Sequence, residues 1–244
     1  MSLIAHYLLN DNAANTTILD ASGNGYNATA PANTNTLHVA GKVGSGALAL
    51  GTSFASRSHT AAIAITGDLT VAFWFKNVAG TPIYQCGNWN YSVSSYEAWE
   101  VLIGYDFFAP GASAGRLAFR HGDGTAFAVF QAAGQPLNDT NWHHVCVKRV
   151  SPNQIQNVTF CVDGSLVSGS LASGTATRTA ADAAESYLYI NRGAPVTGET
   201  YDDFRIYNEA ITAETLTRTY NGGAGHEANW PPYLYHRRPT LIGV

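Results

Sequence analysis

The chain has 244 residues, of which 12% are charged and 45% hydrophobic, with 24 glycines and a formal net charge of -4. So little charge combined with so much glycine excludes a helical bundle and favours short strands joined by turns. The slight negative charge and the lack of a basic stripe exclude nucleic-acid binding that depends on neutralising phosphates. A chain of this length buries a substantial core as one domain.

Strand patterns follow one another along most of the chain. The clearest is Leu69–Lys76, whose β-branched and aromatic residues are typical of a buried strand. Ser151-Pro152-Asn153 predicts a turn that joins 141–149 and 157–164 into an antiparallel hairpin, and Asp163-Gly164 predicts a second turn into Ser165–Val167. We expect the other strands at 3–9, 47–50, 81–87, 97–105, 116–121, 127–131, 187–190 and 200–207.

One late segment is helical by its pattern. Residues 212–220 begin at a candidate N-cap, Thr212, and end before Asn221-Gly222-Gly223. Many short strands followed by one short helix predict an all-β sandwich. Since no repeat or linker divides the chain, we expect one domain over residues 1–225.

Residues 226–244 differ in character from the rest. Proline and aromatic residues without periodicity predict an extended C-terminal arm, which either docks on a partner or folds back on its own domain. The basic trio at 236–238 is either a solvated tail or part of the same contact. The candidate partner-binding residues are Trp230, Tyr233, Tyr235, Arg237 and Arg238.

Six motifs occur in order between residue 3 and about residue 221. They are the segments 5–11, 20–25, 41–44 with 47–48, 69–76, 142–145 with 162–164, and 201–211. Together they resemble the laminin-G-like jelly-roll family of the concanavalin A-like lectin/glucanase superfamily. The resemblance implies a two-sheet antiparallel jelly-roll sandwich. It does not imply one function, because this superfamily includes lectins, adhesion modules, hydrolases and structural domains.

The acidic and amide side chains of two motifs form a candidate calcium site. Asp20 and Asn24 offer hard oxygen ligands in a glycine-rich loop, and Ca²⁺ takes about six to eight oxygens. The resemblance implies that this loop lies near the closing strand, where Asp202 or Asp203 would complete the shell. Neighbouring strand residues point to opposite faces, so one of that pair should face inward. The alternative is an Asx-turn at Asp20 and a solvated acidic pair.

Catalysis has little support in the sequence. Related glucan hydrolases carry alternating carboxylates on one strand, and a retaining pair lies about 5–5.5 Å apart. Glu97 and Glu100 are three residues apart, so on a strand they face opposite ways and we expect a solvent-exposed pair. The resemblance implies a structural place for His143-His144, and no nucleophile with a recognisable base accompanies them. We therefore expect no enzyme activity and no catalytic residues.

Aromatic residues cluster between residues 89 and 105. Their faces could stack on sugar rings, with Asn88 and Asn90 supplying hydrogen bonds, or they could fill the core, as aromatic residues commonly do. The candidate ligand-binding residues are Trp89, Tyr91, Tyr96 and Trp99, and Tyr105 belongs to the same cluster.

The three cysteines and the hydropathy pattern bear on compartment. Cys146 and Cys161 lie on successive predicted strands and could pair, although an odd cysteine count favours buried free thiols. No apolar run approaches the roughly 18 residues of a membrane span, and no leader pattern is visible. We expect synthesis in the cytosol, with display on an assembled particle such as a virion as one outcome.

Two functional hypotheses follow from these observations. The first is a non-catalytic recognition module for carbohydrate or a protein surface, with a structural calcium ion. The second is a structural decoration or fibre protein on a virus (phage) particle, anchored through the C-terminal arm. A glycan hydrolase or lyase is the weakest alternative, because the carboxylate array is missing.

Overall fold

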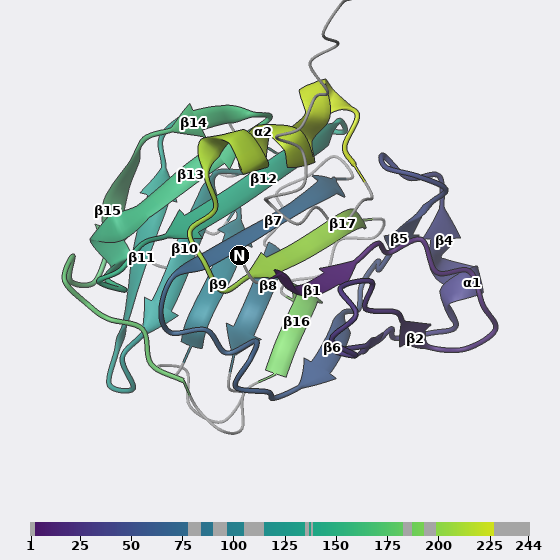
Figure 1. Cartoon of the computed structure of the whole chain (residues 1–244), viewed down its shortest axis with the longest axis horizontal. Helices are drawn as coiled ribbons and strands as arrows, with labels where there is room; N and C mark the ends of the chain where they lie inside the picture. Colours follow the sequence, from purple (N-terminus) through teal and green to yellow (C-terminus); the bar gives the residue numbers. More distant parts are fainter. Residues whose placement is uncertain are drawn as a thin grey trace, which may run out of the picture.

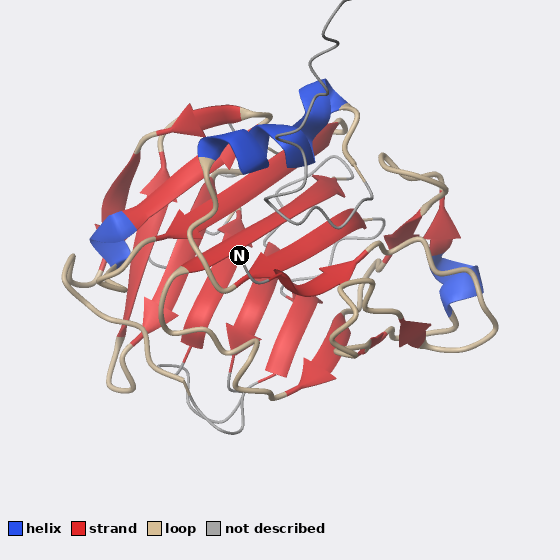
Figure 2. Ribbon diagram, in the orientation of Figure 1, coloured by secondary structure: helices blue, strands red, loops and turns tan. Residues whose placement is uncertain are grey.

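The computed structural model describes residues 3–77, 84–89, 97–104, 115–134, 137, 139–182, 187–192 and 199–226. Within these residues the strands form two antiparallel sheets, of eight and nine strands, that pack face to face (Figure 1). The predicted sandwich is therefore confirmed. Helices are short and lie at the periphery of the two sheets (Figure 2).

The eight-stranded sheet contains the predicted hairpin and the closing strand. Its strand order is β14 (Ser165–Val167), β13 (Val158–Val162), β12 (Trp142–Arg149), β7 (Leu69–Lys76), β17 (Thr200–Tyr207), β5 (Ala47–Ala49) and β4 (His38–Val39), and β1 (Leu3–Tyr7) also pairs with β17. Cys146 and Cys161 are direct partners in the β12–β13 ladder, as expected, and both thiols are free and buried.

The nine-stranded sheet holds the middle of the chain together with segments from both ends. Its strand order is β15 (Gly169–Ser173), β11 (Phe127–Ala132), β10 (Leu117–Gly122), β9 (Glu97–Ile103), β8 (Tyr84–Trp89), β16 (Tyr187–Arg192), β6 (Ala55–Ser58), β3 (Ala28–Thr29) and β2 (Thr17–Ile18).

The elements that the pattern did not predict are short or polar. Five strands, β2, β3, β4, β6 and β15, and the four-residue helix α1 (Thr34–Leu37) were missed. The sequence of β6 is Ala-Ser-Arg-Ser and that of β15 is Gly-Ser-Leu-Ala-Ser, with no β-branched or aromatic residue in either. Such segments become strands because neighbouring strands offer them hydrogen bonds, which local propensity does not reveal.

The main core lies between the sheets, and β7 shows how it forms. Val71, Phe73 and Phe75 point into this core, whereas Ala72 belongs to a second cluster on the outer face of the same sheet. Both faces of β7 are buried, because helix α2 (Ala213–Tyr220) lies across the outer face of the eight-stranded sheet (Figure 1).

Helix α2 begins where the sequence predicted. The Thr212 side chain accepts a hydrogen bond from the backbone N–H of Thr215, which confirms the expected N-cap. Tyr220 at the last turn stacks on Trp74 with ring centroids 5.7 Å apart. A Cβ on Gly164 would lie 2.5 Å from the Tyr220 ring, so the Asp163-Gly164 turn needs glycine to let the helix pack.

A buried arginine connects the two sheets. The Arg149 guanidinium, from β12, donates hydrogen bonds of 2.6–3.0 Å to the carbonyl oxygens of Ile65, Gly67 and Ala98. Ala98 belongs to β9 of the opposite sheet. Burial lowers the pKa of Arg149 to about 9, but the group remains charged at neutral pH.

Arg149→Met should lower the free energy of unfolding by about 3 kcal/mol, because three carbonyls lose their donor and two of them belong to the buried residues Ile65 and Ala98. Urea denaturation measures this change. The control is Arg218→Met on the exposed side of α2, which should cost less than about 1 kcal/mol. Equal effects of the two substitutions would contradict a special role for Arg149.

Candidate functional site

Aromatic side chains gather on the outer face of the nine-stranded sheet, at β16 and the segment that leads into β6. Phe54 and Tyr187 are 42% and 41% exposed, which is unusual for large apolar side chains in this protein. Leu188 and Ile190 point into the core, so the alternation of a strand places Tyr187 and Tyr189 on the outer face. We call Phe54, Tyr187, Tyr189 and Arg192 the aromatic surface.

The members of the aromatic surface contact one another. Phe54 meets Tyr189 edge-on, with ring centroids 5.1 Å apart, and Tyr187 and Tyr189 are 5.9 Å apart. The Arg192 guanidinium lies 5.4 Å from the centre of the Tyr189 ring, in cation–π geometry. These contacts hold the rings in place before any ligand arrives, which reduces the entropy lost on binding.

Among the described residues of the predicted aromatic cluster, Trp89 lies beside this surface. Trp89 is the ladder partner of Tyr187 across β8 and β16, but the structure describes only its backbone. The prediction for Trp99 is wrong: this side chain is 0% exposed and donates a 2.7 Å hydrogen bond to the carbonyl of Ile63. Tyr91, Tyr96 and Tyr105 lie outside the described residues.

The sequence did not single out Tyr187 and Tyr189 as candidate ligand-binding residues, although it predicted the strand that contains them. The signal was available in the alternation Tyr-Leu-Tyr-Ile, because a strand with leucine and isoleucine facing the core turns both tyrosines outward. Phe54 and Arg192 carry no comparable signal. They join the surface only because β6 pairs with β16 and because the ladder of β8 and β16 shifts register before Arg192.

The expected solvent-exposed pair of glutamates is not observed. Glu100 is 1% exposed, and its carboxylate lies 2.5 Å from the Arg120 guanidinium on the neighbouring strand. Glu100 and Arg120 are ladder partners of β9 and β10, so the pairing of the two strands explains the ion pair. The Glu97 side chain lies outside the described residues.

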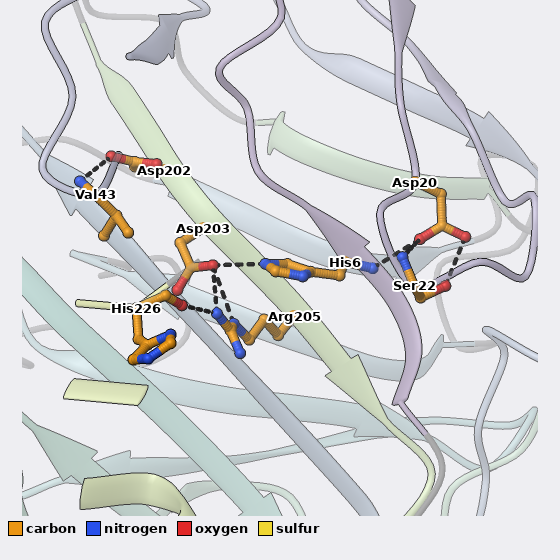
Figure 3. A network of polar contacts seen from close by, with 8 residues as sticks. All are labelled: His6, Asp20, Ser22, Val43, Asp202, Asp203, Arg205 and His226. Carbon is orange, nitrogen blue, oxygen red and sulfur yellow. Dashed lines mark hydrogen bonds and ion pairs between the residues drawn. The ribbon is translucent and has the colours of Figure 1, made fainter. Parts of the chain in front are cut away.

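Asp20 organises the N-terminal loop through hydrogen bonds. Its two carboxylate oxygens accept from the backbone N–H groups of His6, Ser22 and Tyr26 and from the Ser22 hydroxyl, at 2.8–2.9 Å (Figure 3). Burial alone would raise the pKa of Asp20, but these hydrogen bonds hold it below its ordinary value. The Asn24 amide donates to the carbonyls of Leu3 and Ile4.

Asp203 lies at the centre of a buried network that joins distant parts of the chain. Its Oδ1 is 2.6 Å from Nε2 of His6 on β1 and accepts hydrogen bonds of 2.9 and 3.0 Å from Arg205 (Figure 3). Arg205 also donates to the carbonyl of His226. The chain therefore binds its N-terminal strand and residue 226 to the same point of β17.

Asp202 faces a different loop. Its Oδ2 accepts hydrogen bonds from the backbone N–H groups of Lys42 and Val43, at 2.7 and 2.8 Å (Figure 3). A Cβ on Gly41 would lie 2.8 Å from this oxygen, so the loop needs glycine to approach it. Burial raises the pKa of Asp202 to about 7. Because Asp202 and Asp203 are both buried, the alternative of a solvated acidic pair is wrong.

The structure does not bring the four predicted calcium ligands into one shell. Asp20 and Asp203 bind opposite ends of His6, Asp202 binds the loop at 42–43, and Asn24 uses its amide nitrogen. Across the described ranges no group of three His, Cys, Asp or Glu side chains is arranged to hold a metal ion. Calcium binding stays a prediction, and it would require these carboxylates to exchange N–H donors for a cation.

The adjacent histidines of β12 have opposite environments. His144 packs against Trp74 and Tyr220, and burial lowers its pKa to about 4, so it is neutral. His143 has Nδ1 2.8 Å from Asp163 and Nε2 2.9 Å from Asp139. Both ring nitrogens can donate only when the ring is protonated, and the hydrogen bond with Asp163 is the largest cause that raises the pKa of His143.

The candidate partner-binding residues Trp230, Tyr233, Tyr235, Arg237 and Arg238 lie outside the described residues, as does the predicted arm beyond His226. No helix in the described part of the chain is long and apolar enough to cross a membrane.

Asp20→Ala should lower the free energy of unfolding by about 2 kcal/mol, because three backbone N–H groups and one hydroxyl lose their acceptor. Urea denaturation with and without chelator measures the loss. If Asp20 acts only through hydrogen bonds, the substitution should lower the free energy of unfolding by the same amount with and without chelator. A chelator that destabilises the wild type but not the variant would instead show that Asp20 holds calcium. Glu214→Ala on exposed α2 is the control.

The stabilising contribution of protonated His143 should depend on pH. A raised folded-state pKa means that this contribution is complete below the unfolded pKa of about 6.5 and is lost as pH rises through the folded value. The stability gap between wild type and His143→Leu, measured by urea midpoints, should therefore shrink from pH 6 to pH 9. The stability of the wild type relative to His144→Phe should instead rise from pH 6 to pH 9, since His144 is neutral in the fold but binds a proton in the unfolded chain below about pH 6.5.

Solved structures with the same architecture share little sequence with this chain. The binding domain of Paraclostridial Mosquitocidal Protein 1 has 14% identity and a TM-score of 0.66, and the match covers 91% of this chain and 52% of that one. A botulinum neurotoxin type C structure has 15% identity and a TM-score of 0.58, and the match covers 90% of this chain and 51% of that one. Trypanosoma rangeli sialidase has 14% identity and a TM-score of 0.55, and the match covers 89% of this chain and 32% of that one. The chain thus spans about half the length of the toxin structures.

A comparison with curated proteins finds no match. The sequence profile of a laminin-G-type family, described as the concanavalin A-like lectin/glucanases superfamily, matches residues 50–217. This range includes β6 through most of α2, and so both sheets of the sandwich. The chain belongs to the concanavalin A-like lectin/glucanase superfamily.

Proposed function

We propose that this protein is a non-catalytic recognition module that binds carbohydrate through the aromatic surface. The observation that carries the proposal is the exposure of Phe54 and Tyr187 beside Tyr189 on the outer face of a rigid sheet. One face of a sugar ring consists of C–H groups, which pack on aromatic rings, while the hydroxyl groups at the ring edge stay hydrated or meet polar side chains.

The composition of the surface fits a sugar better than an apolar protein segment. Its rings are set at angles of 85° and 37° to one another, so they form a stepped surface and not a continuous apolar plane. Arg192 adds a donor beside Tyr189. The similar botulinum neurotoxin type C enters cells through interaction with two ganglioside molecules, which are glycolipids, and this supports a glycan as the ligand class.

The arrangement of carboxylates supports recognition without hydrolysis. A retaining glycosidase places two carboxylates about 5–5.5 Å apart, facing the substrate. On the outer face near the aromatic surface, Glu100 is buried and its charge is balanced by Arg120. The Arg120 guanidinium occupies this carboxylate, so Glu100 does not face a substrate as a glycosidase carboxylate does.

A glycan array with the wild type and Tyr187→Ala tests the proposal. We expect selective binding by the wild type and at least a tenfold loss in the variant, equivalent to about 1.4 kcal/mol. Leu166→Ala, which truncates an exposed apolar side chain of β14 in the other sheet, should bind like the wild type. A blank array, or equal binding by Tyr187→Ala, would contradict the proposal.

The role as a virus-particle component stays a prediction that depends on the C-terminal arm. No described residue argues for a particle partner, so the wild type and a chain truncated after residue 228 should be compared for incorporation into particles. Unchanged incorporation would remove this hypothesis.

A further inference from the structure

We infer that a second site, away from the aromatic surface, binds an acidic sugar residue, such as a uronic acid, through its carboxylate and hydroxyl groups. The site is a cleft of about 660 Å³ at the rim of the sandwich, which we call the rim cleft. It is lined by the ends of β10 and β11 from one sheet and of β12, β13 and β14 from the other. This volume accommodates a mono- or disaccharide.

One wall of the rim cleft is apolar and is supplied by both sheets. Its side chains are those of Leu117, Ala132, Leu137, Val162 and Val167. Leu137 is held in position by a 2.7 Å hydrogen bond from its backbone N–H to the carbonyl of Gly115. Such a wall suits the C–H face of a sugar ring, since contact removes apolar area from water on both partners.

Arg116 provides the anion-binding element of the rim cleft. It precedes β10 and lines the cleft, and its Nε is buried without a hydrogen-bond partner among the described residues. An unsatisfied buried N–H is unfavourable, so an acceptor that reaches this N–H would be stabilising, and the positive charge of Arg116 attracts an anion to the cleft. The guanidinium edge that contains Nε matches a carboxylate in a two-hydrogen-bond geometry.

Two carboxylates among the lining residues of the rim cleft supply acceptors. Asp139 and Asp163 both bind His143, and their side chains remain 50% and 38% exposed. A carboxylate has about four lone-pair sites, so each keeps acceptor capacity for a hydroxyl donor. The charged side chains among the described lining residues are Arg116, His143, Asp139 and Asp163. When His143 is protonated their charges sum to zero, so a single ligand carboxylate meets no net repulsion from them.

These features together select the ligand class. A simple fatty carboxylate would satisfy Arg116 but would bring no hydroxyls to Asp139 and Asp163. A neutral sugar would bring hydroxyls but would leave Arg116 without an anion. A sugar acid provides the carboxylate, the hydroxyls and the apolar ring face in one molecule. The inference adopts the carbohydrate class of the proposed function, but it rests on a different group of side chains.

Two probes that differ only at C6 test the inference: methyl β-D-glucuronide and methyl β-D-glucoside. Calorimetric or NMR titration of the full chain should show at least tenfold tighter binding of the glucuronide. Arg116→Met should lower glucuronide affinity at least tenfold and so remove the preference for the glucuronide over the glucoside. Arg218→Met, the matched control on exposed α2, should retain the wild-type preference.

Equal affinity of the two glycosides for the wild type, or no binding of either, would overturn the inference. A preference that persists in Arg116→Met would do the same. The comparison of the two probes on the wild type decides the question even if Arg116→Met does not fold. Tyr187→Ala should keep the glucuronide preference, so loss of the aromatic surface and loss of the rim cleft give separate results.

Discussion

The backbone bulge at Asp202 and Asp203 is the constraint on which the closure of the sandwich depends. The β17–β7 ladder shifts register between Asp202 and Arg205, and Asp203 has a positive φ of 50°. The bulge buries both carboxylates but directs them to different partners. Asp203 binds His6 and Arg205, and Asp202 binds the loop at 42–43. One irregular step of one strand thereby connects β1, the loop before β5 and, through Arg205, the backbone at His226.

This network explains why the family motifs occur together. The motif at 5–11 contributes His6, the motif at 20–25 contributes Asp20, the motif at 41–44 contributes backbone N–H groups, and the motif at 201–211 contributes both aspartates. The same carboxylates suggested calcium from sequence, because a hydrogen-bond acceptor and a hard metal ligand are the same chemical group. Only the positions of the N–H donors distinguish the two roles.

The two sheets expose their outer faces differently, and the proposed sugar-binding surface lies on the face that helix α2 does not cover. Helix α2 covers the outer face of the eight-stranded sheet, with Tyr220 stacked on Trp74 and Leu216 packed near Cys146 and Cys161. The outer face of the nine-stranded sheet presents Phe54 and Tyr187 to solvent. The rim, where the sheets meet, adds a cleft with charged and apolar walls. Both proposed binding sites therefore lie where no helix of the described residues is packed.

The sequence by itself determined the fold class, the central strands and helix α2, because β-branched and aromatic runs and a threonine N-cap act locally. It did not determine which aromatic residues face a ligand. Trp99 and Tyr187 both lie on strands, yet Trp99 fills the core and Tyr187 faces solvent. Tertiary structure alone decided that the polar segment β6 forms a strand, because its partner β16 lies far away in the chain. It also decided that Arg116, which precedes β10 of one sheet, and His143, on β12 of the other, line the same cleft.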